Sequence, residues 1–154
     1  MKQYSAFLWI LPVLLLFSSC TKKEDDSPLP DINVTRCVIQ EPGGSAENME
    51  STDPTVEFNG DTTEIDNSFG RSKWLWFQVK GQTPGTYNLN LGTNRAIYNS
   101  SLNVEFSTIA GTITFATVDK AAKKIKGTFD NMVLVSISGT DTVRINDGTF
   151  NIDN

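Results

Sequence analysis

The sequence predicts an all-β protein: a single antiparallel domain of the β-sandwich or flattened β-barrel type, built largely from a meander of hairpins. Apolar and polar residues alternate with a period of two in many short segments, which is the pattern of half-buried strands. Residues that favour turns separate these segments at intervals of roughly eight to twelve residues. No long segment has the apolar period of a helix.

The N-terminus has the features of an export signal. Lys2 precedes an apolar run at 6–17, which is too short to span a membrane, and small residues follow it. The sequence Phe17-Ser18-Ser19-Cys20 resembles the lipobox of bacterial lipoproteins, whose cysteine is acylated and becomes the first residue of the mature chain. The resemblance implies a signal peptide at 1–19 and a membrane anchor through acyl chains on Cys20. The alternative is an ordinary secretory signal with an incidental cysteine.

Residues 20–33 are expected to form the lipidated cysteine and a flexible acidic tether, because they are charged, contain proline and offer almost nothing to bury. Two lysines followed by Glu24, Asp25 and Asp26 resemble the export signal that sends Bacteroidota lipoproteins to the outer face of the outer membrane. That resemblance implies an outer-membrane protein exposed at the cell surface. The alternative is a solvated spacer.

The domain itself is expected at 34–154. Its N-terminal part predicts strands separated by loops at 41–54 and 66–72, and Asn59-Gly60 is a strong hairpin signal. A strand of alternating residues, including Leu102, precedes Gly111. The other strands expected in this part are 34–40, 55–58, 62–65, 73–79, 86–91 and 96–98.

The stretch 111–138 shows the pattern most clearly, and we expect three antiparallel strands in it. In the first, Ile113 and Phe115 share one face. Residues 119–123 are polar and rich in lysine, as in a hairpin loop. Residues 132–137 are nearly continuous in apolar side chains, which predicts a third, central strand covered on both faces.

The second strand of this stretch gives a sharp prediction of which side chains are buried. One set of alternating residues is apolar or small and should face the core, and the other set should face water. The inward set is Ile125, Gly127 and Phe129, and the outward set is Lys124, Lys126 and Thr128. After it, strands at 142–145 and 149–152 are expected to flank a tight turn at Asn146-Asp147-Gly148.

Charge and composition exclude several functions. The chain has 154 residues, which is enough for one domain with a core. Removal of 1–19 takes away Lys2 and no acid, so twelve basic residues remain against eighteen acidic ones, a net charge of −6. An acidic excess argues against a nucleic-acid partner. The absence of histidine excludes Ser-His-Asp and Cys-His catalysis and any His-ligated metal.

Cys37 has no partner for a disulfide within the chain if Cys20 is acylated. It alternates with Val38 in a strand-like segment, so burial as a small apolar residue is the expected state. A reactive or intermolecularly bonded thiol is the alternative.

Residues 84–153 carry a second resemblance. The order GTYNLN, AIY, GTITFATVD, KKIKGTF and VRINDGTFNI is similar to a family of uncharacterised Bacteroidota lipoproteins defined as a domain of unknown function. The repeated Gly-Thr-aromatic pattern carries the likeness. The family implies no catalytic or ligand-binding residues.

Trp74 and Trp76 are the candidate ligand residues, because two neighbouring tryptophans on one strand face can stack on sugar rings. The segment is apolar on both faces, however, and this favours a place in the core. Oxygen ligands for calcium at Asp141, Asn146 and Asp147 fit no loop template, and the turn explains their composition. No metal, cofactor or catalytic residue is therefore predicted.

The sequence as a whole predicts a lipid-anchored, non-enzymatic binding or interaction module of the outer membrane, with a glycan or an envelope protein as its partner. One alternative is a small carbohydrate-active enzyme that uses a carboxylate pair, which would need two carboxyl groups about 5 to 9 Å apart. The other is a structural envelope protein without a small ligand.

Overall fold

The structure is a computed structural model that describes residues 32–154. The predicted signal peptide, Cys20 and nearly all of the tether lie outside the described residues. Within 32–154, no helix has the length and apolar character needed to cross a membrane.

The described chain is all-β and antiparallel, as predicted. Nine strands follow one path in a single sheet, in the order β2-β1-β10-β9-β8-β7-β5-β4-β3, and β6 pairs with β8 beside that path. Most neighbours in this order are joined by hairpins or short loops. The strands are β1 (Val34–Gln40), β2 (Ala46–Ser51), β3 (Thr55–Asn59), β4 (Thr62–Phe69), β5 (Lys73–Lys80), β6 (Gly85–Asn88), β7 (Arg95–Asn99), β8 (Glu105–Asp119), β9 (Lys124–Ser136) and β10 (Thr142–Asp153).

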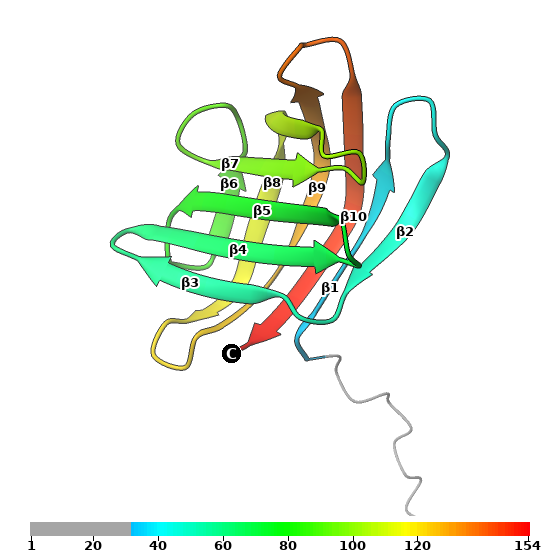
Figure 1. Cartoon of the computed structure of the whole chain (residues 1–154). Coiled ribbons are helices and arrows are strands. Elements are labelled where there is room, and N and C mark those ends of the chain that lie inside the picture. Colours follow the sequence, from blue (N-terminus) through cyan, green and yellow to red (C-terminus); the bar gives the residue numbers. More distant parts are fainter. Residues whose placement is uncertain (1–31) are drawn as a thin grey trace, which may run out of the picture.

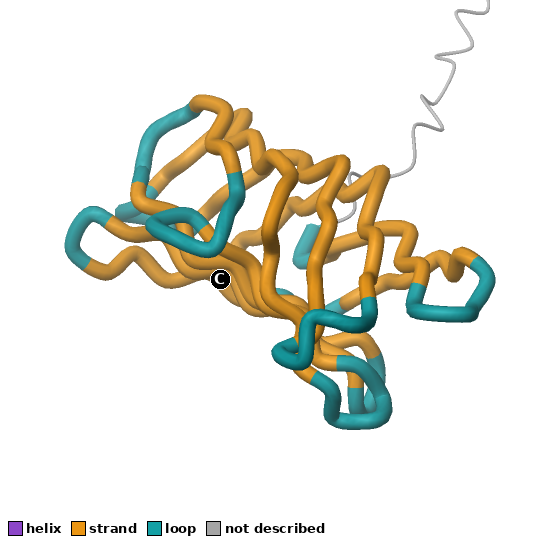
Figure 2. The backbone as a smooth tube through the Cα atoms, turned by 90° about the horizontal axis from the view of Figure 1, so that it is seen from above, coloured by secondary structure: helices purple, strands orange, loops and turns teal. Residues whose placement is uncertain are grey.

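The sheet is strongly curled into a half-barrel (Figures 1 and 2). Strands β3, β4, β5 and β7 form one half and run across β8, β9 and β10 in the other (Figure 1). The C-terminus reaches the edge strand β3, where Asn154 Nδ2 donates a hydrogen bond of 3.1 Å to the carbonyl of Val56. One sheet therefore supplies both walls of the core, as a sandwich or flattened barrel would.

The core is built where the two halves of the sheet meet. Phe77 of β5 packs on Phe129 of β9 with ring centroids 4.9 Å apart, and Phe129 stacks on Phe150 of β10 at 6.3 Å. These aromatic contacts join the two halves directly. The predicted inward residues Ile113, Phe115, Ile125, Gly127 and Phe129 are all buried, and Lys124, Lys126 and Thr128 are exposed.

The two Gly-Thr-Phe segments form a reciprocal pair on adjacent strands. Residues 127–129 of β9 and 148–150 of β10 run antiparallel, so Gly148 lies opposite Phe129 and Gly127 lies opposite Phe150. A Cβ atom on Gly148 would lie 2.2 Å from the Phe129 ring, and one on Gly127 would lie 2.5 Å from the Phe150 ring. Each aromatic ring thus covers a glycine across the ladder, a device found in curved sheets.

The predicted turn at Asn146-Asp147-Gly148 is wrong, because β10 passes through it as one strand. Before this point the buried residues of β10 have odd numbers, as Val143 and Ile145 do. After it they have even numbers, as Gly148 and Phe150 do. Asp147 has a φ of 52° and the β1–β10 register shifts at this level, which are the marks of a bulge. The same residue chemistry that favours a turn therefore bends the strand.

The stretch 111–138 contains parts of two strands rather than three strands. The predicted second and third strands are one strand, β9. Its buried residues have odd numbers up to Phe129 and even numbers from Met132 on, and the change occurs around Asn131, which has a φ of 53°. The strand expected before Gly111 is likewise continuous with the next as β8. β9 is central in the sheet as predicted, between β8 and β10. The cover expected on both faces of 132–137 is wrong, because Val133 and Val135 are only half-buried and Ile137 is 83% exposed.

Four boundaries between strands and loops also differ from the prediction. The expected loop 41–54 contains β2, and the expected loop 66–72 contains the end of β4. Leu102 lies in a turn and is 82% exposed instead of alternating within a strand, because β8 begins only at Glu105. The hairpin after β3 turns at Gly60-Asp61, one residue later than Asn59-Gly60, since Asn59 pairs with Thr62.

Candidate functional site

The two tryptophans lie on the outer face of β5, so their expected place in the core is wrong. Leu75, Phe77 and Val79 are completely buried on the inner face, whereas Trp74 and Trp76 are only half-buried. A strand with two apolar faces suggests cover on both sides. Within residues 32–154 no second layer covers the outer face of β5, and both tryptophans keep part of their surface exposed.

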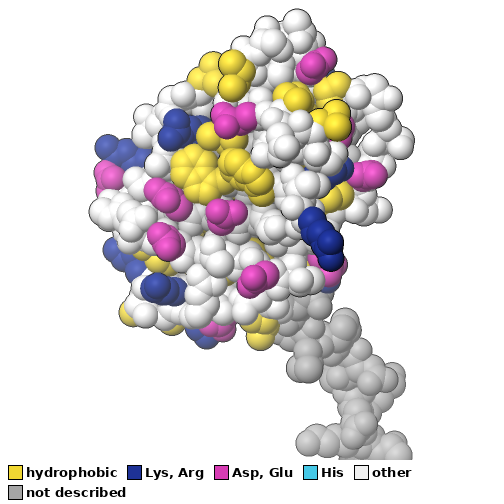
Figure 3. Space-filling view, in the orientation of Figure 1, with side chains coloured by type: hydrophobic (Ala, Val, Ile, Leu, Met, Phe, Trp, Pro, Cys, Tyr) yellow, Lys and Arg dark blue, Asp and Glu magenta, His cyan; other side chains and the backbone are white. Residues whose placement is uncertain are grey.

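Trp76 borders a small hollow of about 210 Å³ on this outer face, which we call the Trp76 hollow. Thr55 and Glu57 of β3 and Glu64 and Asp66 of β4 line the rest of it. Strand register brings them together: Glu57 lies opposite Glu64, and Asp66 lies between Thr55 and Trp76. Figure 3 shows apolar side chains on this face with acidic side chains around them.

The Arg95 side chain packs against the Trp76 ring. Its guanidinium carbon lies 5.4 Å from the ring centroid, within the range of a cation–π contact. Arg95 Nε donates a hydrogen bond of 3.1 Å to Gln78 Oε1, and Gln78 Nε2 donates one of 3.3 Å to Glu64 Oε1. A chain of hydrogen bonds therefore connects the arginine on Trp76 with a carboxylate of the hollow.

The carboxylates of the Trp76 hollow are acceptors without a salt-bridge partner in the part of the chain that the structure describes. Partial desolvation raises the pKa of Asp66, and a backbone hydrogen bond from Asn67 acts in the opposite direction. An aromatic wall beside several hydrogen-bond acceptors can hold a ring that is apolar on its face and rich in hydroxyls at its edge.

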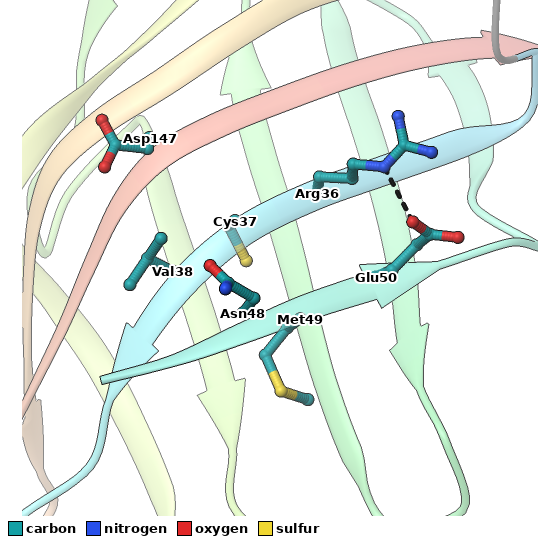
Figure 4. Close-up of a pocket in the computed structure, with 7 residues that line it drawn as sticks. All are labelled: Arg36, Cys37, Val38, Asn48, Met49, Glu50 and Asp147. Carbon is teal, nitrogen blue, oxygen red and sulfur yellow. Dashed lines mark hydrogen bonds and ion pairs between the residues drawn. The ribbon is translucent and has the colours of Figure 1, made fainter. Parts of the chain in front are cut away.

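A larger hollow of about 430 Å³ lies between β1 and β2 but offers little chemistry (Figure 4). Arg36 Nε and Glu50 Oε2 form an ion pair of 2.7 Å across these strands. Cys37 also lines the hollow but is only 3% exposed, and burial raises the pKa of its thiol to about 12. The expectation of a buried cysteine is confirmed, and burial disfavours the thiolate that the alternative of a reactive thiol requires.

A buried tyrosine cluster at the end of the half-barrel was not predicted from the sequence. The Tyr98 hydroxyl donates a hydrogen bond of 2.5 Å to Glu41 Oε1, and Lys73 Nζ lies 3.2 Å from Glu41 and 3.1 Å from Glu47. Desolvation and the bond to Glu41 raise the pKa of Tyr98. Desolvation lowers the pKa of Lys73, but its two carboxylate partners outweigh this and the net shift is upward. The cluster ties the β1–β2 hairpin to β5 and β7.

The rejected calcium ligands do not come together as a site. Asp141 lies in the loop before β10, and Asp147 lies in the bulge, where its backbone N–H donates a 3.1 Å hydrogen bond to Asp130 Oδ1. Between residues 32 and 154, no group of three or more His, Cys, Asp or Glu side chains is placed to hold a metal ion.

Comparison of the chain with known proteins gives no match to a family model, to a curated protein or to a solved structure. The resemblance of residues 84–153 to Bacteroidota lipoproteins stays a prediction. The functional argument therefore depends on the residues and the geometry described above.

Proposed function

We propose that this protein is a lipid-anchored, non-enzymatic glycan-binding module of the outer membrane and that the face around Trp74 and Trp76 is its binding surface. The observation that carries the proposal is the incomplete burial of Trp76 at the edge of a hollow lined with carboxylates. Full burial of a large apolar side chain stabilises a fold by about 1.5 to 3 kcal/mol. Two adjacent tryptophans gain only part of this on an open face, which favours a role in binding.

The residues around Trp76 suit the two kinds of contact that a sugar makes. The apolar face of a pyranose can pack on an indole ring, while its hydroxyls can donate hydrogen bonds to carboxylates. Glu57, Glu64 and Asp66 supply acceptors next to the ring, and Arg95 supplies donors on its other side. Trp74, two residues away on the same face, can extend the surface to a neighbouring sugar.

The anchor predicted at Cys20 is part of this proposal. The tether leads into β1, whose start lies beside the C-terminus, where the Asp153 N–H donates a hydrogen bond of 2.6 Å to Asn33 Oδ1. Replacement of Glu24, Asp25 and Asp26 by alanine should leave the protein acylated but remove it from the cell surface. Protease shaving of intact cells measures this. If the variant is cleaved as readily as the wild type, the acidic run is a spacer and not an export signal.

A glycan array with the full-length protein tests the binding proposal. Trp76→Ala should abolish the signal, while the free energy of unfolding in urea should fall by less than the roughly 1.5 to 3 kcal/mol that full burial of a large apolar side chain contributes. Ile137→Ala is a matched control, since Ile137 is an apolar residue that is 83% exposed and does not line the hollow. Equal binding by wild type and Trp76→Ala would contradict the proposal.

A second candidate function is glycoside hydrolysis by a carboxylate pair, and the direct opposition of Glu57 and Glu64 favours it. Release of reducing ends from a polysaccharide panel, lost in Glu64→Gln, would support hydrolysis. Binding without product release would support the non-enzymatic module.

A further inference from the structure

The Trp76 hollow carries more negative charge than a neutral ligand requires. Glu57 and Glu64 lie directly opposite each other, an arrangement of like charges that destabilises a sheet. Asp66 adds a third carboxylate, and none of the three has a salt bridge within the described residues. A ligand that brings a positive charge would relieve this repulsion.

Trp76 supplies a second feature, independent of the acidic residues. The ring already has one cation against it, because the Arg95 guanidinium carbon lies 5.4 Å from its centroid. Arg95 belongs to β7 and is held by Gln78, so it approaches from the β7 side of β5. The hollow lies on the opposite side, towards β4 and β3. Aromatic rings attract ammonium groups through cation–π contacts, and carboxylates accept charge-assisted hydrogen bonds from them.

The size of the hollow limits what can enter it. Its volume of about 210 Å³ lies below the roughly 300 to 1,000 Å³ of sites for drug-sized ligands. One sugar residue or one cationic group fits such a space, and a longer ligand must continue over the open face towards Trp74.

We propose that the Trp76 hollow binds an amine-bearing sugar, with the protonated amine among Glu57, Glu64 and Asp66 and the sugar ring against Trp76. This inference rests on the proposed function and specifies its ligand class. A glucosamine residue with a free amino group meets the requirement, and an N-acetylated residue of the same shape lacks the charge.

Calorimetric titration of the full-length protein with two oligosaccharides tests the inference. The probes are a glucosamine tetramer and an N-acetylglucosamine tetramer at about pH 6, where carboxylates are ionised and amino groups are protonated. We expect the glucosamine tetramer to bind at least about tenfold more tightly, as a charge-assisted hydrogen bond between an ammonium group and a carboxylate allows. The preference should decrease as salt is added.

Two variants separate the hollow from the general acidity of the protein. Glu64→Gln should remove most of the preference for the amine, because it takes one charge from the hollow. Asp141→Asn also removes one carboxylate charge, at an exposed loop position that does not line the hollow, and it should keep the preference. A loss of preference that is equal in the two variants would overturn the inference.

The remaining outcomes distinguish this inference from the proposed function. Equal affinity for the two tetramers, with binding lost in Trp76→Ala, would overturn the amine preference and leave glycan binding intact. Failure of both tetramers and of the glycan array would overturn both. Tighter binding of an oligolysine peptide than of the glucosamine tetramer would overturn the choice of a sugar in favour of a basic peptide.

Discussion

Phe129 is the side chain whose removal should damage the fold most. It is 1% exposed and packs on Phe77 from the opposite half of the sheet and on Phe150 from the adjacent strand. Replacement of a buried phenylalanine by alanine costs about 3 to 5 kcal/mol from lost transfer free energy and the cavity that remains. The cross-strand partner of Phe129 is Gly148, which has no side chain to fill that cavity. We therefore expect the upper half of this range, about 4 to 5 kcal/mol.

Urea unfolding measures this loss in a chain that lacks residues 1–30. The matched control is Lys126→Ala on the outer face of the same strand, which should change the free energy of unfolding by no more than about 0.5 kcal/mol. A typical domain has a stability of about 5 to 15 kcal/mol, so Phe129→Ala is expected to leave it marginal. Comparable losses in the two variants would refute the register, because a slip by one residue exchanges the two faces of a strand.

Three further predictions concern other parts of the chain. Gly148→Ala should destabilise the domain by about 1 to 3 kcal/mol, since its Cβ would meet the Phe129 ring, whereas Gly44→Ala meets nothing closer than 3.5 Å and should be nearly neutral in thermal unfolding. Cys37 should resist alkylation by iodoacetamide in the folded protein at pH 8, because burial raises its thiol pKa to about 12, and mass spectrometry should detect modification only after unfolding. Cys20→Ser should abolish labelling by an alkyne fatty acid, and equal labelling of wild type and mutant would show that the lipid is attached elsewhere.

The alternation of apolar and polar residues correctly predicted the strands that have one face in the core and the other face in solvent. Ile125 and Phe129 face inward as expected because a half-buried strand has a period that the sequence displays directly. The edge strand β2 was missed because its residues are mostly polar and exposed. Its conformation depends on the pairing with β1, for which the sequence AENMES contains no local signal.

The bulge at Asp147 was predicted as a turn for a physical reason. A positive φ serves a tight turn and a strand bulge equally well, and Asn, Asp and Gly favour both. Only the pairing of β10 with β1 and β9 along its whole length distinguishes the two.

The candidate site could be predicted only in part. The sequence places Trp74 and Trp76 on one strand face, but the number of layers over that face is a property of the whole sheet. The hollow also depends on where the β3–β4 hairpin turns. A turn at Asn59-Gly60 would have put Glu57 opposite Thr62, whereas the observed turn one residue later puts it opposite Glu64.

The central claim is that the Trp76 hollow binds a glycan, and titration of wild type and Trp76→Ala with the glucosamine tetramer tests it most directly. The account predicts saturable binding by the wild-type protein, quenching or enhancement of its tryptophan fluorescence, and loss of both in Trp76→Ala with folding intact. Binding that survives Trp76→Ala unchanged would contradict the account and move the site away from this face of the sheet.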